Sequence, residues 1–578
     1  MRASERLARC CLVLLGLILP FEAPLFRVGP LQITSVELLM YVTLALFAVD
    51  VSLRSVRSPG SVRRAIIAWR HDPLARAAVL WVSTVVVCAV LAPDDRLASI
   101  KFALRTLCGV LVFFATRSLA RAPEVARRVV LALVVGALVS AMTASVESWF
   151  QGTAPMFAAF RETSFGSLGL PRASGVFAYP TIGAMYWEAA VSLLLVLPFI
   201  GNEVSPRAGA IAGAVAAAAL LFVAILASAT RSAIAGSAII CLSLWFLTRH
   251  WSASLARASV ASIVTLVVVA AAIVLLPGPS SLLGQRLRWW NDGAWFGVTY
   301  ELPKAPREVR DGEVFPTPMR LRNTGAVTWR HTGDRPTRLA HHWYAVGERG
   351  GETLVAFNGR RTDLPADVPP GGAIDVEAVA RAPVIDGPYR LAWDLVQEDV
   401  TWFSQRGNAT GDEPVVVNGA AVAETTPVAD AGWSSPPPLP PPRAMLWRAA
   451  AVLWTKHPLM GSGPDNFRRR YEAVLSPGPT REPYTDTRIH ANSLYFETLA
   501  DEGTVGVVAL LVLGLAWLAA LRAHRSAQRV LGLGVGLAAG AFFAHGAFDY
   551  FLEFTPTYGL FWMLLGLTSA SGRSWPDP

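Results

Sequence analysis

The sequence has little cysteine, little charge and none of the common metal-binding spacings. Its five cysteines among 578 residues all lie in or beside long apolar runs, at Cys10, Cys11, Cys88, Cys108 and Cys241. The long polar segment 277–490 has none, so it must fold without disulfides. C-x-x-C and H-E-x-x-H spacings are absent, and no metal or other cofactor is expected. Charged residues make up only 16% of the chain, which excludes an ordinary soluble protein and a disordered one.

Hydrophobic residues form 53% of the chain, and the mean hydropathy is +0.42. They gather in runs that suit helices of about 20 residues, the length that crosses a hydrocarbon core of roughly 30 Å. We expect twelve spans, near 8–25, 31–51, 76–92, 103–118, 126–148, 183–201, 208–229, 232–248, 257–276, 498–521, 528–547 and 553–570. A signal peptide is the alternative for residues 1–25, but no small-residue cleavage site follows, which favours a retained first helix.

Basic residues predict the orientation of these spans. Arginines concentrate in segments that face the cytoplasm if the N-terminus lies there, such as Arg54–Arg76, Arg117–Arg128 and Arg522–Arg529. Segment 277–490 then faces the periplasm or cell exterior, and the chain is a multi-pass protein of the cytoplasmic (inner) membrane. That segment has as many acidic as basic residues, so the pI of about 9.6 reflects the cytoplasmic side. It does not indicate nucleic acid binding.

The predicted fold class is an α-helical polytopic membrane protein with about twelve transmembrane helices and a large extracytoplasmic loop containing an antiparallel β-sandwich. The expected parts are a membrane domain of about nine helices (1–276), the sandwich (289–418), a Pro-rich linker (419–443), an extracytoplasmic catalytic-loop region (444–497) and a membrane domain of about three helices (498–570). A helix is expected from Ala444, lying on the membrane surface or packed on the sandwich.

The sandwich is predicted from about seven short β-rich runs separated by Gly, Pro, Asn and Asp. Four tryptophans would supply bulky core or edge contacts: Trp329, Trp343, Trp393 and Trp402. The N-x-G-x-x-x-W turn from Asn323 to Trp329 resembles that of certain immunoglobulin-like modules.

Four polar residues directly precede the tenth apolar run. They are Arg488, His490, Asn492 and Glu497. Ionisable residues at a membrane entrance are costly, so they usually serve a site. His490 is the candidate general base, because imidazole titrates near neutral pH. A structural role is the alternative for His490, and capping of the following helix is the alternative for Asn492.

Two arginines lie in other predicted outer-facing loops. Arg231 stands in a very short connection between two apolar spans, flanked by Thr230 and Ser232 as further donors. A guanidinium fork suits phosphate oxygens, although it can also reach lipid headgroups. Arg172 lies in the constrained loop LPRASGVFAYP and is either a placed ligand or an ordinary loop residue.

Three further polar residues near the outer ends of spans are possible site residues: Glu188, His545 and Asp549. Hydrogen bonds between helices are the alternative role for all three.

Together the motifs resemble those of the O-antigen ligase and O-antigen polymerase family. They are T-R-S-A-x-x-G (Thr230–Gly236), G-x-G-x-x-x-F (Gly461–Phe467), H-x-N-x-x-x-x-E (His490–Glu497), E-G-x-x-G (Glu502–Gly506) and H-x-x-x-D (His545–Asp549). The resemblance covers roughly 160–276 and 445–570, and excludes the β insertion. Ser232 stands where glycine is common in the family.

The resemblance implies a metal-independent membrane glycosyltransferase. Such an enzyme moves a glycan from undecaprenyl diphosphate to an acceptor hydroxyl, on lipid A core or a similar glycan, lipid or protein. Arg172 and Arg231 would meet the negative charge that develops on the diphosphate, and His490 would take the acceptor's proton. Arg488, Asn492 and Glu497 are further candidate substrate-binding residues.

Other functions remain open at the level of sequence. An O-antigen or exopolysaccharide polymerase and a protein O-oligosaccharyltransferase share the donor chemistry and differ in the acceptor. A transporter or flippase also suits twelve spans, but no two-fold repeat of the span pattern is visible. A scaffold or receptor would depend on the sandwich instead of the arginines.

Overall fold

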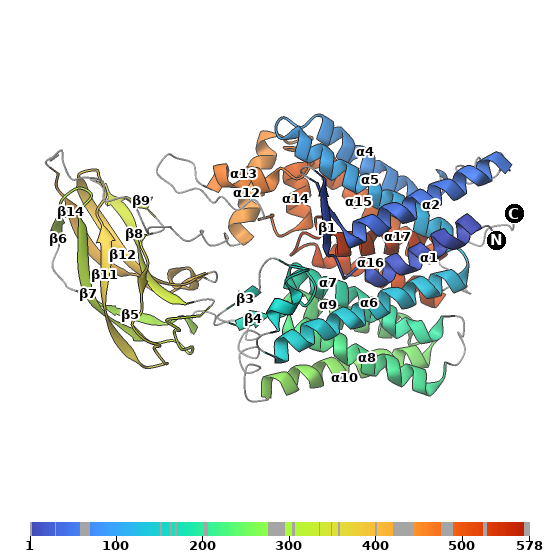
Figure 1. Ribbon diagram of the computed structural model, residues 1–578, viewed down its shortest axis with the longest axis horizontal. Helices are drawn as coiled ribbons and strands as arrows, with labels where there is room; N and C mark the ends of the chain where they lie inside the picture. Colours follow the sequence, from blue (N-terminus) through green and yellow to red (C-terminus); the bar gives the residue numbers. More distant parts are fainter. Residues whose placement is uncertain are drawn as a thin grey trace.

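The computed structural model shows a mostly helical chain with a separate body of β-strands, which lies between α10 and α12 in sequence (Figure 1). It describes residues 3–571 except for 29–30, 58–59, 61–69, 151–152, 162–164, 168–169, 201–205, 276–294, 303–306, 334–335, 348–349, 357–358, 399–400, 420–440, 442, 476–488 and 524–528.

Nine helices in the described part of the chain are long and apolar enough to cross a membrane. They are α2 (Ser35–Arg57), α4 (Pro73–Val90), α5 (Arg96–Leu119), α6 (Pro123–Trp149), α7 (Pro180–Val196), α8 (Ala208–Ala227), α9 (Arg231–Thr248), α10 (Ala253–Leu275) and α15 (Gly503–Ala523). The other three predicted spans coincide with shorter helices, α1 (Ala3–Ile18), α16 (Arg529–His545) and α17 (Thr555–Ser571). The prediction of a largely helical chain with many apolar helices of membrane length is confirmed.

Local sequence sets where several of these helices begin. Three start at a proline, namely Pro73, Pro123 and Pro180. Proline suits the first helical turn because its missing N–H has no partner there in any case. Asp72 additionally caps α4, accepting a hydrogen bond from the backbone N–H of Leu74 at 3.0 Å.

Two predicted spans end or divide where the hydropathy pattern continues. The span near 8–25 ends at Ile18, because Pro20 lacks the N–H donor that would continue the helix. The chain then forms a hairpin of β1 (Pro24–Val28) and β2 (Leu31–Thr34). The span near 498–521 is divided into α14 (Leu494–Asp501) and α15 at Gly503, which has a positive φ of 66°.

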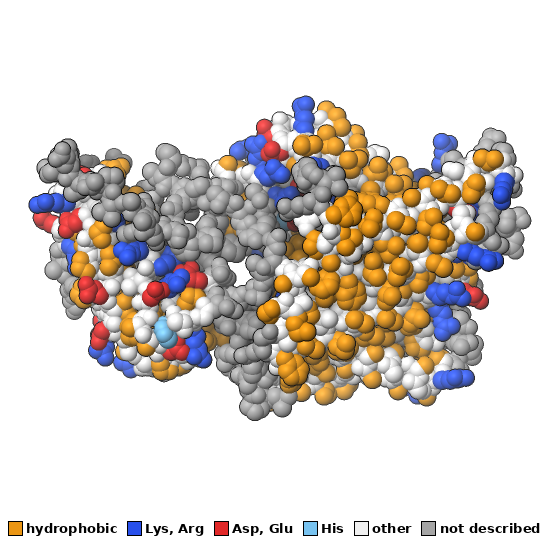
Figure 2. Space-filling model, viewed as in Figure 1, with side chains coloured by type: hydrophobic (Ala, Val, Ile, Leu, Met, Phe, Trp, Pro, Cys, Tyr) orange, Lys and Arg blue, Asp and Glu red, His pale blue; other side chains and the backbone are white. Residues whose placement is uncertain are grey.

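Helix α7 lies at the centre of the helical body. It is the most deeply buried of the nine and contacts α6, α8, α9 and α16. Hydrophobic side chains cover the visible middle of this body, and Lys and Arg gather at the end away from the β body (Figure 2). A polar side chain on the inner part of α7 is therefore surrounded by other helices.

The β body consists of two facing sheets. One has the order β10-β8-β12-β14-β6, with β9 and β13 at its margins, and the other has the order β11-β7-β5. The strands are β5 (Val298–Glu301), β6 (Arg307–Val309), β7 (Val314–Asn323), β8 (Thr337–Val346), β9 (Glu352–Ala356), β10 (Thr362–Asp363), β11 (Ala373–Arg381), β12 (Gly387–Gln397), β13 (Thr401–Trp402) and β14 (Gly411–Val417). The pairing is antiparallel except that β14 and β6 run parallel, a difference from the predicted sandwich.

Tryptophans fill much of the β body. Trp329, Trp343 and Trp393 lie in the core between the sheets, whereas Trp402 packs in a separate cluster with Ala340 and Val396. Alternating burial along β7 and β11 places every second side chain inside.

The N-x-G-x-x-x-W turn has a clear physical role. The Asn323 side chain donates to the carbonyls of Val327 and Val368, both at 2.8 Å. A Cβ at Gly325 would overlap the carbonyl of Trp295, so only glycine fits there.

Three short helices form a cap beside the helical body. They are α12 (Arg443–Lys456), α13 (Phe467–Leu475) and α14, and a common apolar cluster joins them. The Trp447 and Phe496 rings stack with centroids 5.1 Å apart. The helix expected from Ala444 is thus α12, and it packs on α13 and α14. The cap lies at the end of the helical body that faces the β body (Figure 1).

Candidate active site

One connection, between α16 and α17, organises the polar centre of the molecule. It follows His545 and carries Asp549, Tyr550 and Glu553. The backbone N–H of Leu494, at the start of α14, donates to the carbonyls of Gly546 at 2.7 Å and Asp549 at 3.1 Å. These bonds fix the segment that contains His490 against the connection, although the two are distant in sequence.

His490 is held by the helix that follows it. Its Nδ1 lies 2.6 Å from Glu497 Oε1, and the backbone N–H of Ala491 donates to Glu497 Oε2 at 2.6 Å. The Tyr550 ring stacks on the imidazole with centroids 4.9 Å apart. His490 is only 6% exposed and Glu497 1%. Glu497 therefore fixes the orientation of the imidazole ring. An ionised carboxylate can only accept a hydrogen bond, so Nδ1 of His490 carries the hydrogen that points toward Glu497.

Glu553 contacts the opposite nitrogen of the same imidazole. Nε2 forms an ion-pair contact with the Glu553 carboxylate. Arg468 lies 3.6 Å from the other Glu553 oxygen and 2.7 Å from Asp465. His490 is thus placed between two carboxylates, and Glu553 belongs to a larger charged group.

This environment favours the charged imidazole. Burial alone would lower the pKa of His490, but the charges of Glu497 and Glu553 outweigh it and raise the pKa well above its usual value. Burial would raise the pKa of Glu553, but the positive charges of His490 and Arg468 outweigh it and lower that pKa. Both shifts describe one ion pair, His490 protonated and Glu553 ionised.

Asp549 lies among a neighbouring group of positively charged side chains. Arg443 Nη2 on α12 lies 3.6 Å from its Oδ2. Burial raises the pKa of Asp549, while Arg443, His545 and Arg172 oppose that rise. Burial, together with the charges of Arg443 and Arg231, lowers the pKa of Arg172 to about 10 despite the attraction of Asp549. Arg443 and Arg172 thus act electrostatically on the Asp549 carboxylate, and Arg231 acts on Arg172.

Arg172 also connects two loops, the one before α7 and the turn between α8 and α9. Its Nε donates to the carbonyl of Ser228 at 2.8 Å, and its Nη2 donates to Thr230 Oγ1 at 3.1 Å. The next residue's N–H, that of Ala173, donates to the carbonyl of Ala227 at 3.1 Å. The predicted loop arginine is therefore anchored to the turn before α9, where Arg231 is the first helical residue.

A second histidine lies beside this cationic group. His545 Nδ1 is 2.7 Å from Glu188 Oε2 on α7, and its Nε2 is 2.9 Å from Ser232 Oγ on α9. Asp549 Oδ2 lies 3.9 Å from the same Nε2. The residues weighed as possible site members are therefore brought together, and Ser232 joins them.

The glycine motif at Gly461–Phe467 serves packing. The N–H groups of Ser462 and Gly463 donate to the carbonyls of Ala500 and Asp501, both at 2.9 Å. The Asp501 carboxylate accepts from the N–H of Phe467 at 2.7 Å. A Cβ at Gly461 would overlap the Asp501 backbone. The motif thus holds the cap on the break between α14 and α15.

The remaining predicted residues have varied outcomes. Asn492 does not cap α14: Ser493 is the N-cap, and Asn492 has a positive φ of 50°. Arg488 lies outside the described residues. Arg161, in the connection between α6 and α7, forms a buried ion pair with Glu147 that holds the 172–175 loop.

Sequence reasoning missed Glu553, Arg443 and the roles of Arg468 and Tyr550. The hydropathy pattern places Glu553 at the first position of the last span, whereas the helix starts at Thr555 and Pro556. An acidic residue directly before such a start is the signal that would have identified it. Arg443 follows a proline run that gave no hint of its position.

The arrangement offers two imidazole–carboxylate pairs and a cluster of arginines around one connection. It can hold an anionic ligand and move a proton. Among the residues that the structure describes, no group of three or more His, Cys, Asp or Glu is placed to hold a metal ion.

No protein-family model matches the chain, and no curated protein matches it. Among solved structures, the alkylpurine DNA glycosylase AlkC of Pseudomonas fluorescens bound to DNA containing an abasic site analogue matches with 10% identity and a TM-score of 0.17. The match covers 59% of this chain and 97% of that chain. Such a TM-score carries no argument about fold or function.

Proposed function

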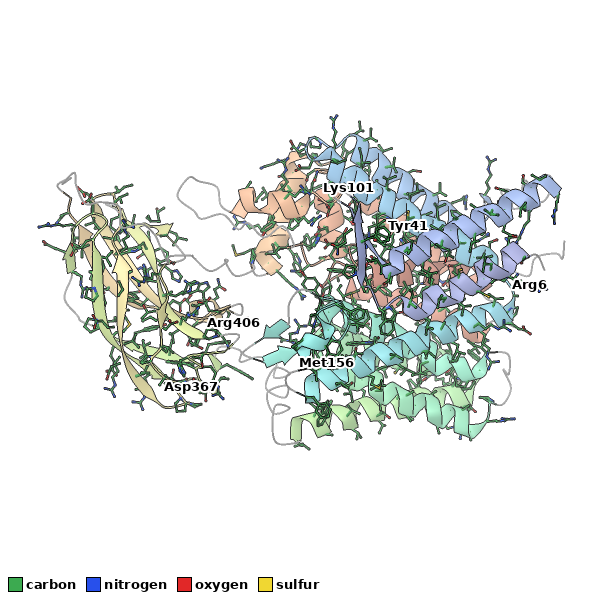
Figure 3. The ribbon with its side chains drawn as sticks, viewed as in Figure 1. Arg6, Tyr41, Lys101, Met156, Asp367 and Arg406 are labelled. Carbon is green, nitrogen blue, oxygen red and sulfur yellow. The ribbon has the colours of Figure 1, made fainter. Side chains whose placement is uncertain are left out.

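We propose that the chain is a multi-pass protein of the cytoplasmic membrane, with its β body and cap on the outer side. Support comes from the nine membrane-length helices and from the basic residues at one end of the helical body. Arg6 lies at that end, whereas Met156 lies at the end that faces the β body (Figure 3). Positively charged ends usually stay in the cytoplasm. A periplasm-dependent reporter fused after Asn418 should be active, and an inactive one would contradict this orientation.

The proposed reaction is transfer of a glycan from undecaprenyl diphosphate to an acceptor hydroxyl, as in the O-antigen ligase family that the motifs resemble. The proposal rests on one observation. The connection between α16 and α17 holds the segment that contains the His490–Glu497 pair, and it also carries Asp549 with its neighbouring arginines. A transfer with a diphosphate leaving group needs both a proton acceptor and fixed positive charge.

The arginines are proposed to bind the diphosphate. The three arginines come from a loop (Arg172), a helix start (Arg231) and the cap (Arg443). Each acts electrostatically on Asp549 or on another of the three. Guanidinium groups offer paired donors to phosphate oxygens and do not lose their charge at neutral pH. In the resting protein the arginines face the single negative charge of Asp549. A bound diphosphate would bring several anionic oxygens to them, so their electrostatic interaction would become stronger when the donor enters.

His490 is proposed to accept the proton of the attacking hydroxyl through Nε2. Glu497 on Nδ1 stabilises the imidazolium that forms, as a carboxylate does in other acid–base pairs. Glu553 occupies the Nε2 side in the resting protein. It must move aside for the acceptor, and its departure lowers the pKa of His490 and frees the nitrogen as a base.

The acceptor is not defined by these residues, because ligase, polymerase and protein-glycosylating reactions share the donor step. We propose a ligase-like acceptor and a docking role for the β body. Deletion of 289–418 should then change which acceptor is used while release of undecaprenyl diphosphate to small acceptors persists. Loss of all release from a folded deletion variant would contradict the docking role.

The test uses membranes of a strain that lacks this chain, because they hold both unreacted donor and acceptor. Purified protein is added and released undecaprenyl diphosphate is measured by mass spectrometry. We expect release by the wild type, a loss of at least about 100-fold for His490→Ala, and a similar loss for Arg231→Ala. His250→Ala, a substitution of an exposed histidine near the other end of α9, is the matched control. Full release by both site variants would overturn the assignment.

A further inference from the structure

The second histidine is built as a complete chain of hydrogen bonds. Glu188, His545 and Ser232 come from three different helices and meet with donor–acceptor distances of 2.7 and 2.9 Å. Glu188 is 1% exposed and His545 3%. An ionised carboxylate only accepts hydrogen bonds, so Nδ1 of His545 carries a hydrogen toward Glu188 and Nε2 exchanges one with Ser232.

The backbone of α9 is shaped to admit this arrangement. A Cβ at Gly236 would overlap Oε1 of Glu188, so any larger residue would displace the carboxylate. Ser232 lies one turn earlier on the same helix. The small residue and the hydroxyl together let α9 approach α7 where the carboxylate lies.

Charged groups lie close to this chain of hydrogen bonds. Asp549 Oδ2 lies 3.9 Å from His545 Nε2 and 3.6 Å from Arg443 Nη2. Arg172 reaches Thr230, two residues before Ser232, and Arg231 precedes Ser232 directly. The hydroxyl of Ser232 therefore stands among the groups proposed to hold phosphate oxygens.

We propose that Glu188, His545 and Ser232 form a proton relay that ends at the leaving diphosphate. This inference rests on the proposed glycan transfer and adds a proton donor to it. Ser232 touches the substrate and is the catalytic residue, whereas His545 supplies the proton and Glu188 positions the imidazole. The two histidines then have opposite tasks, His490 on the acceptor and His545 on the leaving group.

The step balances in atoms and charge. The bond between the anomeric carbon and the diphosphate oxygen breaks, and its electron pair stays on that oxygen. The acceptor oxygen bonds to the anomeric carbon and gives its proton to His490 Nε2. The leaving oxygen takes the hydrogen of the Ser232 hydroxyl, which is replaced from His545 Nε2. His545 begins the step protonated on both nitrogens and ends neutral, His490 begins neutral and ends protonated, and proton exchange with water restores both.

Ser232→Ala tests the relay, because it removes the terminal hydroxyl and leaves the His545–Glu188 pair intact. The probe is the release of undecaprenyl diphosphate from deletion-strain membranes, measured from pH 5 to pH 10. We expect kcat to fall about 10- to 100-fold, with KM changed less than about threefold. The alkaline decline of the wild-type profile, which marks loss of the donated proton, should disappear.

Two further variants separate this role from a structural one. Ser232→Thr keeps a hydroxyl and should restore most of kcat and the alkaline decline. Ser237→Ala removes another buried serine hydroxyl from α9 and should behave as the wild type. Thermal unfolding of each purified variant reports on folding.

The outcomes discriminate between the two claims. Release by the wild type, with unchanged kcat and pH profile in a folded Ser232→Ala, would overturn the relay alone. Failure of Ser232→Thr to restore the alkaline decline would also overturn it. No release by the wild type would overturn the proposed transfer and the relay with it.

Discussion

Replacing Glu553 by glutamine isolates the charge that lies against Nε2 of His490. The substitution keeps the size of the side chain and removes one of the two carboxylates that hold the imidazole in its charged form. If neutral His490 is the base, activity appears as pH rises through the pKa of His490. Glu553→Gln lowers that pKa in the free protein, so the acidic side of the kcat/KM profile should move to lower pH.

The size of the shift follows from the geometry. Two unit charges about 4 Å apart interact by about 4 kcal/mol at an effective dielectric constant near 20 and by about 1 kcal/mol in water. The Glu553 side chain is 32% exposed, so solvent screens part of this interaction. About 1.5 to 3 kcal/mol remains, which corresponds to a shift of about 1 to 2 pH units.

The assay is the pH dependence of undecaprenyl diphosphate release in deletion-strain membranes. Glu37→Gln is the matched control: Glu37 also lies near an arginine, Arg105 at 3.8 Å, but does not contact His490. The control should keep the wild-type profile. An unmoved acidic limb in folded Glu553→Gln, or a limb displaced to higher pH, would rule out the proposed effect of Glu553 on His490.

Three other predictions concern stability and metal. Gly236→Ala should overlap Glu188 and cost about 1–3 kcal/mol, seen as a lower Tm of the purified protein; an unchanged Tm would mean that the carboxylate moves freely. Arg161→Ala leaves the buried Glu147 carboxylate unpaired and should cost about 3–5 kcal/mol in unfolding, with Arg257→Ala as an exposed control; equal loss in both would contradict this. EDTA should leave release of undecaprenyl diphosphate unchanged, because arginines supply the positive charge; loss restored by Mg²⁺ would show otherwise.

The helices and strands could largely be predicted from the sequence, because each has a local signal. Apolar runs of about 20 residues mark the long helices, and alternation with turn residues marks the β body. Helix breaks were harder to predict. The second half of the run 498–521 is apolar throughout, so its composition does not indicate where the helix divides. The division at Gly503 depends on a positive φ and on contact with the Gly461 turn.

The site was only partly predictable, because its contacts join residues far apart in the chain. His490, Glu497 and the arginines stand out as polar residues near apolar runs. The pairs that define their roles, such as Glu188 with His545, depend on how α7, α9 and α16 pack. Asn492 and Ser493 are both good N-cap residues, and only the backbone geometry assigns the cap to Ser493.

The most direct test of the central claim follows both products of the transfer. Purified wild-type protein is incubated with deletion-strain membranes, and mass spectrometry measures undecaprenyl diphosphate together with glycan newly bound to acceptor. We expect one acceptor-linked glycan for each undecaprenyl diphosphate released, with both products lost in His490→Ala. Glycan that stays entirely on its lipid carrier in the presence of folded wild-type protein would contradict it.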